Sequence, residues 1–125
     1  MQDIPVNEIE EILNDIKKNY KDCRNIEILG NASEIKKSRF KAIWHYWGDM
    51  ENPLDSLKNS SFRTISPKVY QRKRLMFDYY TTDISQELLG KKHGKSQRYI
   101  SECKKAFIEE LSIFVESEVS PPRAN

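Results

Sequence analysis

Apolar residues recur at steps of three or four positions in several parts of the chain, which predicts helices rather than strands. The clearest run lies near the C-terminus and comprises Ile100, Cys103, Phe107 and Leu111, continued by Ile113, Phe114 and Val115. A second run comprises Ile9, Ile12, Leu13, Ile16 and Tyr20. A third comprises Ile35, Phe40, Ile43, Trp44 and Trp47. We therefore expect an all-α protein.

The N-terminal run predicts one amphipathic helix from Asn7, as its N-cap, to about Ile28, with Gly30 as a left-handed C-cap. Asn19 falls on the apolar face of this helix, in a register close to a heptad repeat. Two alternatives fit this pattern: the helix packs on the chain's own core, or it pairs with a second copy in a homodimer. We favour packing within the chain, because so short a helix is marginal as a coiled coil.

Ser33 is the expected N-cap of a second helix, in which basic residues lie beside aromatic ones. That combination can bind single-stranded nucleic acid by stacking. We favour the simpler interpretation, in which Trp44 and Trp47 belong to the core and the neighbouring lysines are solvated.

A third helix is predicted to follow a break in the chain. Residues 48–66 contain two groups of turn-forming residues, GDMENP and NSS, and are predicted to be a linker. Ser66 and Pro67 then predict a helix start. The expected apolar contacts of this helix are Val69, Leu75, Met76, Tyr79 and Tyr80. Thr82 or Asp83 is expected to cap the helix after it.

Residues 84–111 have the spacing of a helix-turn-helix, and the residues expected to shape it are Gln86, Gly90, Gly94, Ile100 and Cys103. Gly90 has no side chain where the two helices cross, and Gly94 permits a turn with positive φ. Ser96 follows as the expected N-cap of the second helix. An ordinary helical hairpin, whose glycines only end a helix, is the alternative.

These boundaries divide the chain into four parts. An N-terminal helical region (1–47) would pack or self-associate, and a linker (48–66) would follow it. A helix-turn-helix region (67–118) would bind DNA, and residues 119–125 would form a disordered tail.

Charge is distributed unevenly over the 125 residues. The net charge is +2, but residues 67–106 carry ten Lys/Arg and four Asp/Glu, whereas the segments before and after them are net negative. The basic excess coincides with the predicted helix-turn-helix, as neutralisation of DNA phosphates requires.

The second helix of the motif is expected to contact DNA bases through outward-facing residues, namely Gln97, Arg98, Ser101 and Glu102. Arg98 is the principal candidate, because a guanidinium can donate to both O6 and N7 of guanine. The residues expected to contact phosphates are Arg72, Lys73, Arg74, Lys91, Lys92, Lys95, Ser96, Lys104 and Lys105. For each one taken singly, a solvated helix surface is the alternative.

Other classes of function lack their characteristic residues. Cys23 and Cys103 are too few for a disulfide scaffold and have no histidine at zinc-ligand spacing, so we expect no metal and no other cofactor. A Gly-rich phosphate loop and a nucleophile paired with a base are both missing from the pattern, so we do not expect an enzyme. No apolar run approaches the roughly 18 residues of a membrane span. The acidic N-terminus lacks the pattern of a signal peptide, so we expect a cytoplasmic protein.

Three short motifs follow one another in the C-terminal half of the chain. They are Asp78-Tyr79-Tyr80, then Ser96-Gln97-Arg98, then the Lys-rich stretch 104–108 leading into a long amphipathic helix. In these features residues 70–117 resemble the RinA- and ArpU-like late transcriptional activators of phages of Gram-positive bacteria, although Gly90, His93 and Lys95 depart from the family pattern. The resemblance implies a phage or prophage protein with a sigma-factor-like helix-turn-helix. Such a protein would bind a late promoter and help to recruit host RNA polymerase.

Two other functions fit the same residues. A DNA-recognition subunit of a phage packaging machine, like a small terminase, would need a ring-forming segment, which the N-terminal helix could provide. A module that binds a host protein, such as RNA polymerase or a sigma factor, would suit the acidic segment 109–118 but not the basic segment before it.

Overall fold

The computed structural model describes residues 6–48 and 67–119. These ranges contain the α-helices α1 (Val6–Lys18), α2 (Glu34–Trp47), α4 (Pro67–Thr81), α5 (Gln86–His93) and α6 (Gln97–Val119). Two 3₁₀ turns, η1 (Tyr20–Asp22) and η2 (Ile26–Leu29), connect α1 with α2. The described ranges contain no strand, and the all-α class is confirmed. Most of the predicted linker and tail lies outside the described residues.

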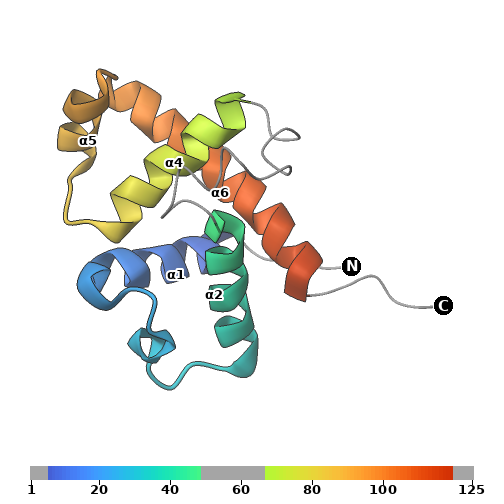
Figure 1. Ribbon diagram of the computed structural model, residues 1–125. Helices are drawn as coiled ribbons and strands as arrows, with labels where there is room; N and C mark the ends of the chain where they lie inside the picture. Colours follow the sequence, from blue (N-terminus) through green and yellow to red (C-terminus); the bar gives the residue numbers. More distant parts are fainter. Residues whose placement is uncertain (1–5, 49–66, 120–125) are drawn as a thin grey trace.

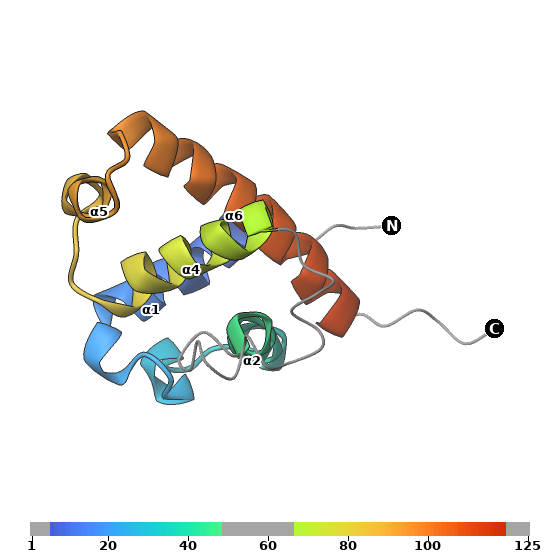
Figure 2. The ribbon, with the colours of Figure 1, turned by 45° about the horizontal axis from the view of Figure 1, so that its top comes forward.

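The longest helix, α6, is the axis of the arrangement (Figure 1). Helices α1, α2 and α4 all pack against it, and α4 also packs on α1. Helix α5 contacts α6 near its N-terminal end and stands apart from α2 in both ribbon views (Figure 2). The first turns of α6 therefore lie beside α5 and α4, whereas α2 packs further along α6, where Tyr46 contacts Phe107 and Phe114.

Aromatic rings form the centre of the core. Trp47 stacks on Phe107, with ring centroids 5.7 Å apart and planes 15° apart, and Tyr80 stacks on the same Phe107 ring at 6.4 Å. All three side chains are fully buried. The interpretation of Trp47 as a core residue is confirmed, and Trp44 is half-buried against that core. Ile35 differs from the prediction, because its side chain is 57% exposed and lies off the apolar face of α2.

The N-terminal region belongs to the same core as the C-terminal helices. The side chains of α1 that face inward are fully or almost fully buried, namely Ile9, Ile12, Leu13 and Ile16. They share one hydrophobic cluster with Leu89 of α5 and with Phe107 and Leu111 of α6. The apolar face of α1 is therefore used for packing within the chain, which is the alternative that we favoured.

The predicted single helix from Asn7 to Ile28 is wrong at both ends. Helix α1 already includes Val6, so Asn7 lies inside it, and it ends at Lys18. Asn19 stops the helix, because it has φ −112° and ψ 38° and its side-chain amide donates to the Asp15 carbonyl at 2.9 Å. The backbone N–H of Asn19 also donates to the Asp15 carbonyl, at 3.1 Å, so the last helical hydrogen bond is kept and the backbone leaves the helical conformation at Asn19 itself. Gly30, with φ +64°, ends only the short turn η2.

Two of the other predicted helix starts are confirmed and one is wrong. The Ser33 hydroxyl accepts from Lys36 N–H at 3.2 Å and caps α2, and α4 begins at Pro67. The cap of α5 is Ser85 rather than Thr82 or Asp83. The Thr82 hydroxyl instead donates to the Asp78 carbonyl at 2.7 Å, near the last turn of α4. No helix in residues 6–48 and 67–119 has the length and apolarity needed to cross a bilayer.

Candidate nucleic-acid interface

Two serines and a glycine define where α5 begins, where it ends and where α6 begins. The Ser85 hydroxyl accepts from Leu88 N–H at 3.1 Å and begins α5. Gly94 ends that helix in the left-handed conformation, with φ +67° and ψ +36°. The Ser96 hydroxyl then accepts from Tyr99 N–H at 3.1 Å and begins α6. The predicted turn at Gly94 and the predicted cap at Ser96 are both confirmed, so a three-residue connection (94–96) joins the helices.

Gly90 lies where α5 meets the turn. Lys95 N–H donates to the Gly90 carbonyl at 2.7 Å. A Cβ added at Gly90 would lie 2.6 Å from the Lys95 carbonyl oxygen and 3.7 Å from Cγ1 of Ile100. Real Cβ atoms do not approach a backbone oxygen so closely, so only glycine fits without movement of the backbone. Position 90 thus requires glycine as predicted, but the close backbone neighbour is Lys95 in the turn rather than the second helix, which meets Gly90 only through the Ile100 side chain.

The inner face of α6 anchors it to the rest of the molecule. Ile100, Cys103, Phe107 and Leu111 are all buried, as the periodicity predicted. Across the motif, Leu89 of α5 is also fully buried, and the amide of Gln86 donates to the Ser101 hydroxyl at 3.4 Å. These contacts leave the opposite face of the first turns of α6 at the surface.

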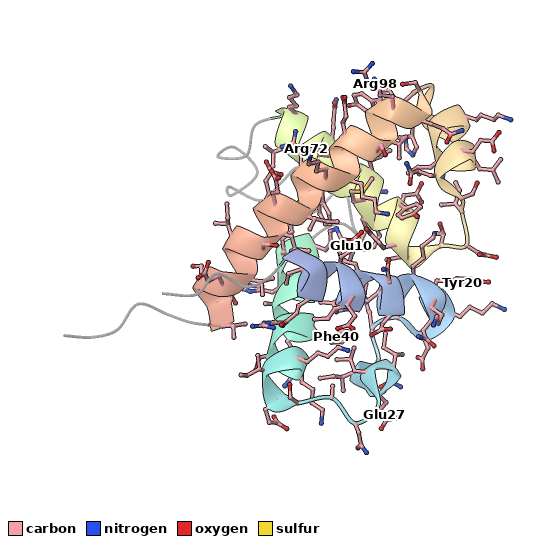
Figure 3. The ribbon with its side chains drawn as sticks, turned by 180° about the vertical axis from the view of Figure 1, so that it is seen from behind. Glu10, Tyr20, Glu27, Phe40, Arg72 and Arg98 are labelled. Atoms are coloured by element: carbon pink, nitrogen blue, oxygen red, sulfur yellow. The ribbon has the colours of Figure 1, made fainter. Side chains whose placement is uncertain are left out.

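The residues on that face define what we call the outer face of α6, and they are Gln97, Arg98, Ser101, Glu102 and Lys105. All five side chains are exposed. Arg98 Nε donates to a Glu102 carboxylate oxygen at 3.3 Å, and the two side chains are 88% and 68% exposed. An ion pair this open to water contributes at most about 1 kcal/mol, so it separates readily when either group finds another partner. Figure 3 shows Arg98 at the N-terminal end of α6, far from Phe40 on α2.

Lysines surround the outer face. Lys91, Lys92 and Lys95 lie at the end of α5 and in the turn, and all three are exposed. Lys91 pairs with Glu87 at 3.7 Å, within its own helix. On α6, Lys105 is exposed, whereas Lys104 is half-buried with its Nζ 5.5 Å from the centre of the Tyr79 ring. Lys91, Lys92 and Lys95 thus lie together at the α5–α6 turn, whereas Lys104 and Lys105 lie further along α6, beside Glu10 of α1.

The basic cluster of α4 does not form one surface. Arg72 is only 14% exposed, and its guanidinium donates to Glu110 on the side of α4 that faces α6 (Figure 3). Lys73 Nζ lies 4.3 Å from the centre of the Tyr46 ring of α2. Arg74 is half-buried beside the α5–α6 turn. We therefore correct the expectation for Arg72, because a guanidinium already paired inside the fold is not placed to hold a DNA phosphate.

Asp78 ties the end of α5 to α4. Its carboxylate accepts from Lys92 Nζ at 3.0 Å and contacts His93 Nε2 at 3.3 Å. Burial raises the pKa of Asp78, but the hydrogen bonds from Lys92 and His93 outweigh it, so this pKa lies below its ordinary value. Asp78 is therefore a structural ion-pair partner that joins α4 to α5.

Lys17 has a role that the sequence pattern did not indicate. Its ammonium donates to three carbonyl oxygens, those of Tyr79 at 2.7 Å, Thr82 at 3.2 Å and Ile84 at 2.7 Å. It also lies 3.9 Å from the centre of the Tyr79 ring. Burial lowers the pKa of Lys17 from its ordinary value. Helix α1 thus fixes the loop that leads from α4 into α5. The only sequence signal is that Lys17 lies in the last turn of α1, at the edge of its apolar face.

Neither cysteine takes part in a disulfide, and no group of three potential metal ligands occurs in the part of the chain that the structure describes. Comparison with protein-family models, with curated proteins and with solved structures found no match to this chain.

Proposed function

We propose that the protein is a sequence-specific double-stranded DNA-binding regulator of transcription that inserts the outer face of α6 into the major groove. The observation that supports the proposal is the difference between the two faces of α6. Its inner face is buried from Ile100 to Val115, whereas its first turns expose a row of hydrogen-bonding side chains with no role in the core. A helix-turn-helix presents its second helix to DNA in this way.

Arg98 is the proposed base-reading residue. In the free protein its guanidinium is paired with Glu102, and that weak pair would open on binding so that Arg98 could donate to guanine O6 and N7. Glu102 would then accept from a cytosine amino group or keep Arg98 oriented. Gln97 and Ser101 are adjacent on the same face and would complete the base contacts.

Phosphate contacts would come from the lysines around this face. Lys91, Lys92 and Lys95 would meet the backbone beside the turn, and Lys104 and Lys105 would meet it along α6. The Ser96 hydroxyl caps α6 and would lie near a phosphate at the positive end of the helix. These contacts position the protein on the duplex but do not distinguish sequences.

The biological setting rests on the resemblance to RinA- and ArpU-like proteins. It supports a phage or prophage activator of late genes that works with host RNA polymerase. Activation rather than repression comes from that resemblance alone, because the same motif serves both.

A gel-shift assay against fragments of the encoding genome, with excess competitor DNA, tests the proposal. We expect one discrete high-affinity fragment, lost in Arg98→Ala and retained in Lys41→Ala, which removes an exposed charge on α2. Weak binding to all fragments, unchanged by Arg98→Ala, would contradict a sequence-specific regulator. Complete absence of binding would favour the host-protein module, and a ring detected by light scattering would favour the packaging subunit.

A further inference from the structure

A pocket of about 280 Å³ lies between α4, the α5–α6 turn and the first turns of α6. Its polar and aromatic lining comprises Tyr70, Gln71, Arg74, His93, Lys95 and Tyr99, with Leu75 as an apolar contact. None of these is a residue of the outer face, so the pocket is distinct from the proposed base-reading surface. We call it the turn pocket.

The chemistry of the turn pocket favours an anion. Three of its residues, Arg74, His93 and Lys95, carry or can carry a positive charge, and no carboxylate is among the described residues that line it. Beside the pocket, Asp78 contacts Nε2 of His93 at 3.3 Å and Lys92 at 3.0 Å. Asp78 thereby orients the imidazole ring and leaves Nδ1 as its other polar atom. Cationic and imidazole groups that converge in this way suit a phosphate.

The aromatic lining of the turn pocket favours a ligand in which a planar, partly apolar group is attached to the phosphate. Tyr70 and Tyr99 present ring surfaces on which a planar group can stack, and the Gln71 amide offers both a donor and an acceptor. Lys95 Nζ already lies 4.8 Å from the centre of the Tyr99 ring, so a cationic group and an aromatic surface are adjacent. The volume of about 280 Å³ lies just below the roughly 300–1,000 Å³ of small-molecule sites, which suits a mononucleotide better than a dinucleotide.

We propose that the turn pocket binds a phosphomonoester with a flat aromatic body, of the class of a nucleoside monophosphate. The phosphate contacts Lys95, His93 and Arg74, and the planar group lies between Tyr70 and Tyr99. A ligand held in this way bridges α4 to the turn and to the start of α6. If the proposed DNA contacts hold, the ligand also occupies Lys95, so it competes with a DNA phosphate for that side chain and weakens DNA binding.

Calorimetric titration of the full chain with adenosine 5′-monophosphate, without DNA, tests the pocket independently of the DNA proposal. We expect binding that is tighter than for adenosine or for inorganic phosphate, and weakened about tenfold or more by Lys95→Ala, which removes a charge-assisted contact. Lys91→Ala is the matched control, because Lys91 is an exposed lysine outside the pocket lining. His93→Gln, which keeps a polar side chain, is expected to weaken binding as well. Thermal unfolding of each variant verifies that it folds.

Three results would overturn the proposal. One is the absence of nucleotide binding, and a second is equal affinity for the monophosphate and for adenosine. The third is nucleotide affinity that Lys95→Ala and Lys91→Ala change equally. If Lys95→Ala weakens only DNA binding, the cations of the pocket serve the DNA backbone, and the nucleotide site is excluded. Failure of the genome-fragment assay, in contrast, leaves the nucleotide titration unaffected.

Discussion

Cationic side chains in two regions of the molecule have opposite environments. At the junction of α1 with the α4–α5 loop, the ammonium of Lys17 is surrounded by three carbonyl oxygens, and Arg72 is paired with Glu110 inside the α4–α6 contact. On the outer face of α6, Arg98 and Lys105 are exposed, and Arg98 pairs with another exposed side chain, that of Glu102. Cations of the first region stabilise the fold, whereas those of the second are available to a ligand.

This contrast shows why a basic segment cannot be interpreted from its net charge alone. Residues 67–106 are strongly basic, yet Arg72 lies among internal contacts and Lys105 lies at the surface. Replacing a cation of the first region should lower stability first. Replacing a cation of the second should lower DNA affinity and leave stability unchanged.

The largest effect on stability is expected at Gly90, where the turn approaches α5 closely. Gly90→Ala forces a Cβ against the Lys95 carbonyl oxygen and should destabilise the protein by about 2–3 kcal/mol. Gly94→Ala is the control, because a Cβ there meets no atom within 4 Å and only the positive φ is unfavourable, at about 1 kcal/mol. Chemical unfolding of both variants measures the difference. Equal losses would show that the close approach at Gly90 is unimportant.

The junction region is tested next by Lys17→Met, which keeps the aliphatic stem and removes the ammonium. Loss of its hydrogen bonds to three carbonyl oxygens should cost about 2 kcal/mol of unfolding free energy. Lys18→Met, at the exposed neighbouring position, should change stability by less than about 0.5 kcal/mol. Operator affinity of the folded Lys17→Met protein should remain close to that of the parent. A large loss of operator affinity with unchanged stability would show that Lys17 acts in DNA binding and does not stabilise the fold.

Lys105→Ala tests the second region through the salt dependence of DNA binding. Loss of one phosphate contact should lower the slope of log K against log salt concentration by about 1, for specific and unrelated DNA alike. Lys41→Ala, on α2, should leave the slope unchanged. Identical slopes for the parent and for Lys105→Ala would show that Lys105 does not contact a DNA phosphate.

The smallest effect is expected at Asp78, which joins α4 to the end of α5. Its pKa in the folded protein lies below the ordinary value of about 3.9, so its stabilising effect is present at neutral pH and is lost as the pH falls through the folded pKa. Asp78→Asn should lower stability by about 0.5 kcal/mol at pH 7, and the difference should begin to shrink at about pH 4 and vanish only once the pH lies below the folded pKa of Asp78. The unfolding free energies of the parent and of Asp78→Asn, measured across this pH range, test whether their difference decreases in acid. A difference that grows in acid would contradict it.

The parts of the fold that local chemistry determines were predictable. Gly94 and Ser96 define the turn through their own backbone and hydroxyl groups, and the periodicity of α6 predicts the burial of Ile100, Cys103, Phe107 and Leu111. Ile113, which continues the apolar run, is instead 71% exposed. The same local patterns predicted the exposure of Arg98 and its neighbours on the outer face.

The parts that depend on distant partners were not predictable. Asn19 was expected on the face of a long helix, but its side chain bonds to the Asp15 carbonyl and the chain turns there. Lys17 and Arg72 looked like ordinary surface cations, and only the approach of α4 to α1 and to α6 gives them internal partners. Periodicity describes which face of a helix is buried, but it does not identify what that face meets.

The most direct test of the DNA-binding account is competition binding of Arg98→Ala to the operator fragment and to an unrelated duplex, compared with the parent and with Lys41→Ala. We predict that Arg98→Ala loses about tenfold or more in operator affinity, as expected for loss of a bidentate base contact, while its affinity for the unrelated duplex and its thermal stability change little. Equal losses on both duplexes, or no loss on the operator, would show that the outer face of α6 does not recognise a DNA sequence through Arg98.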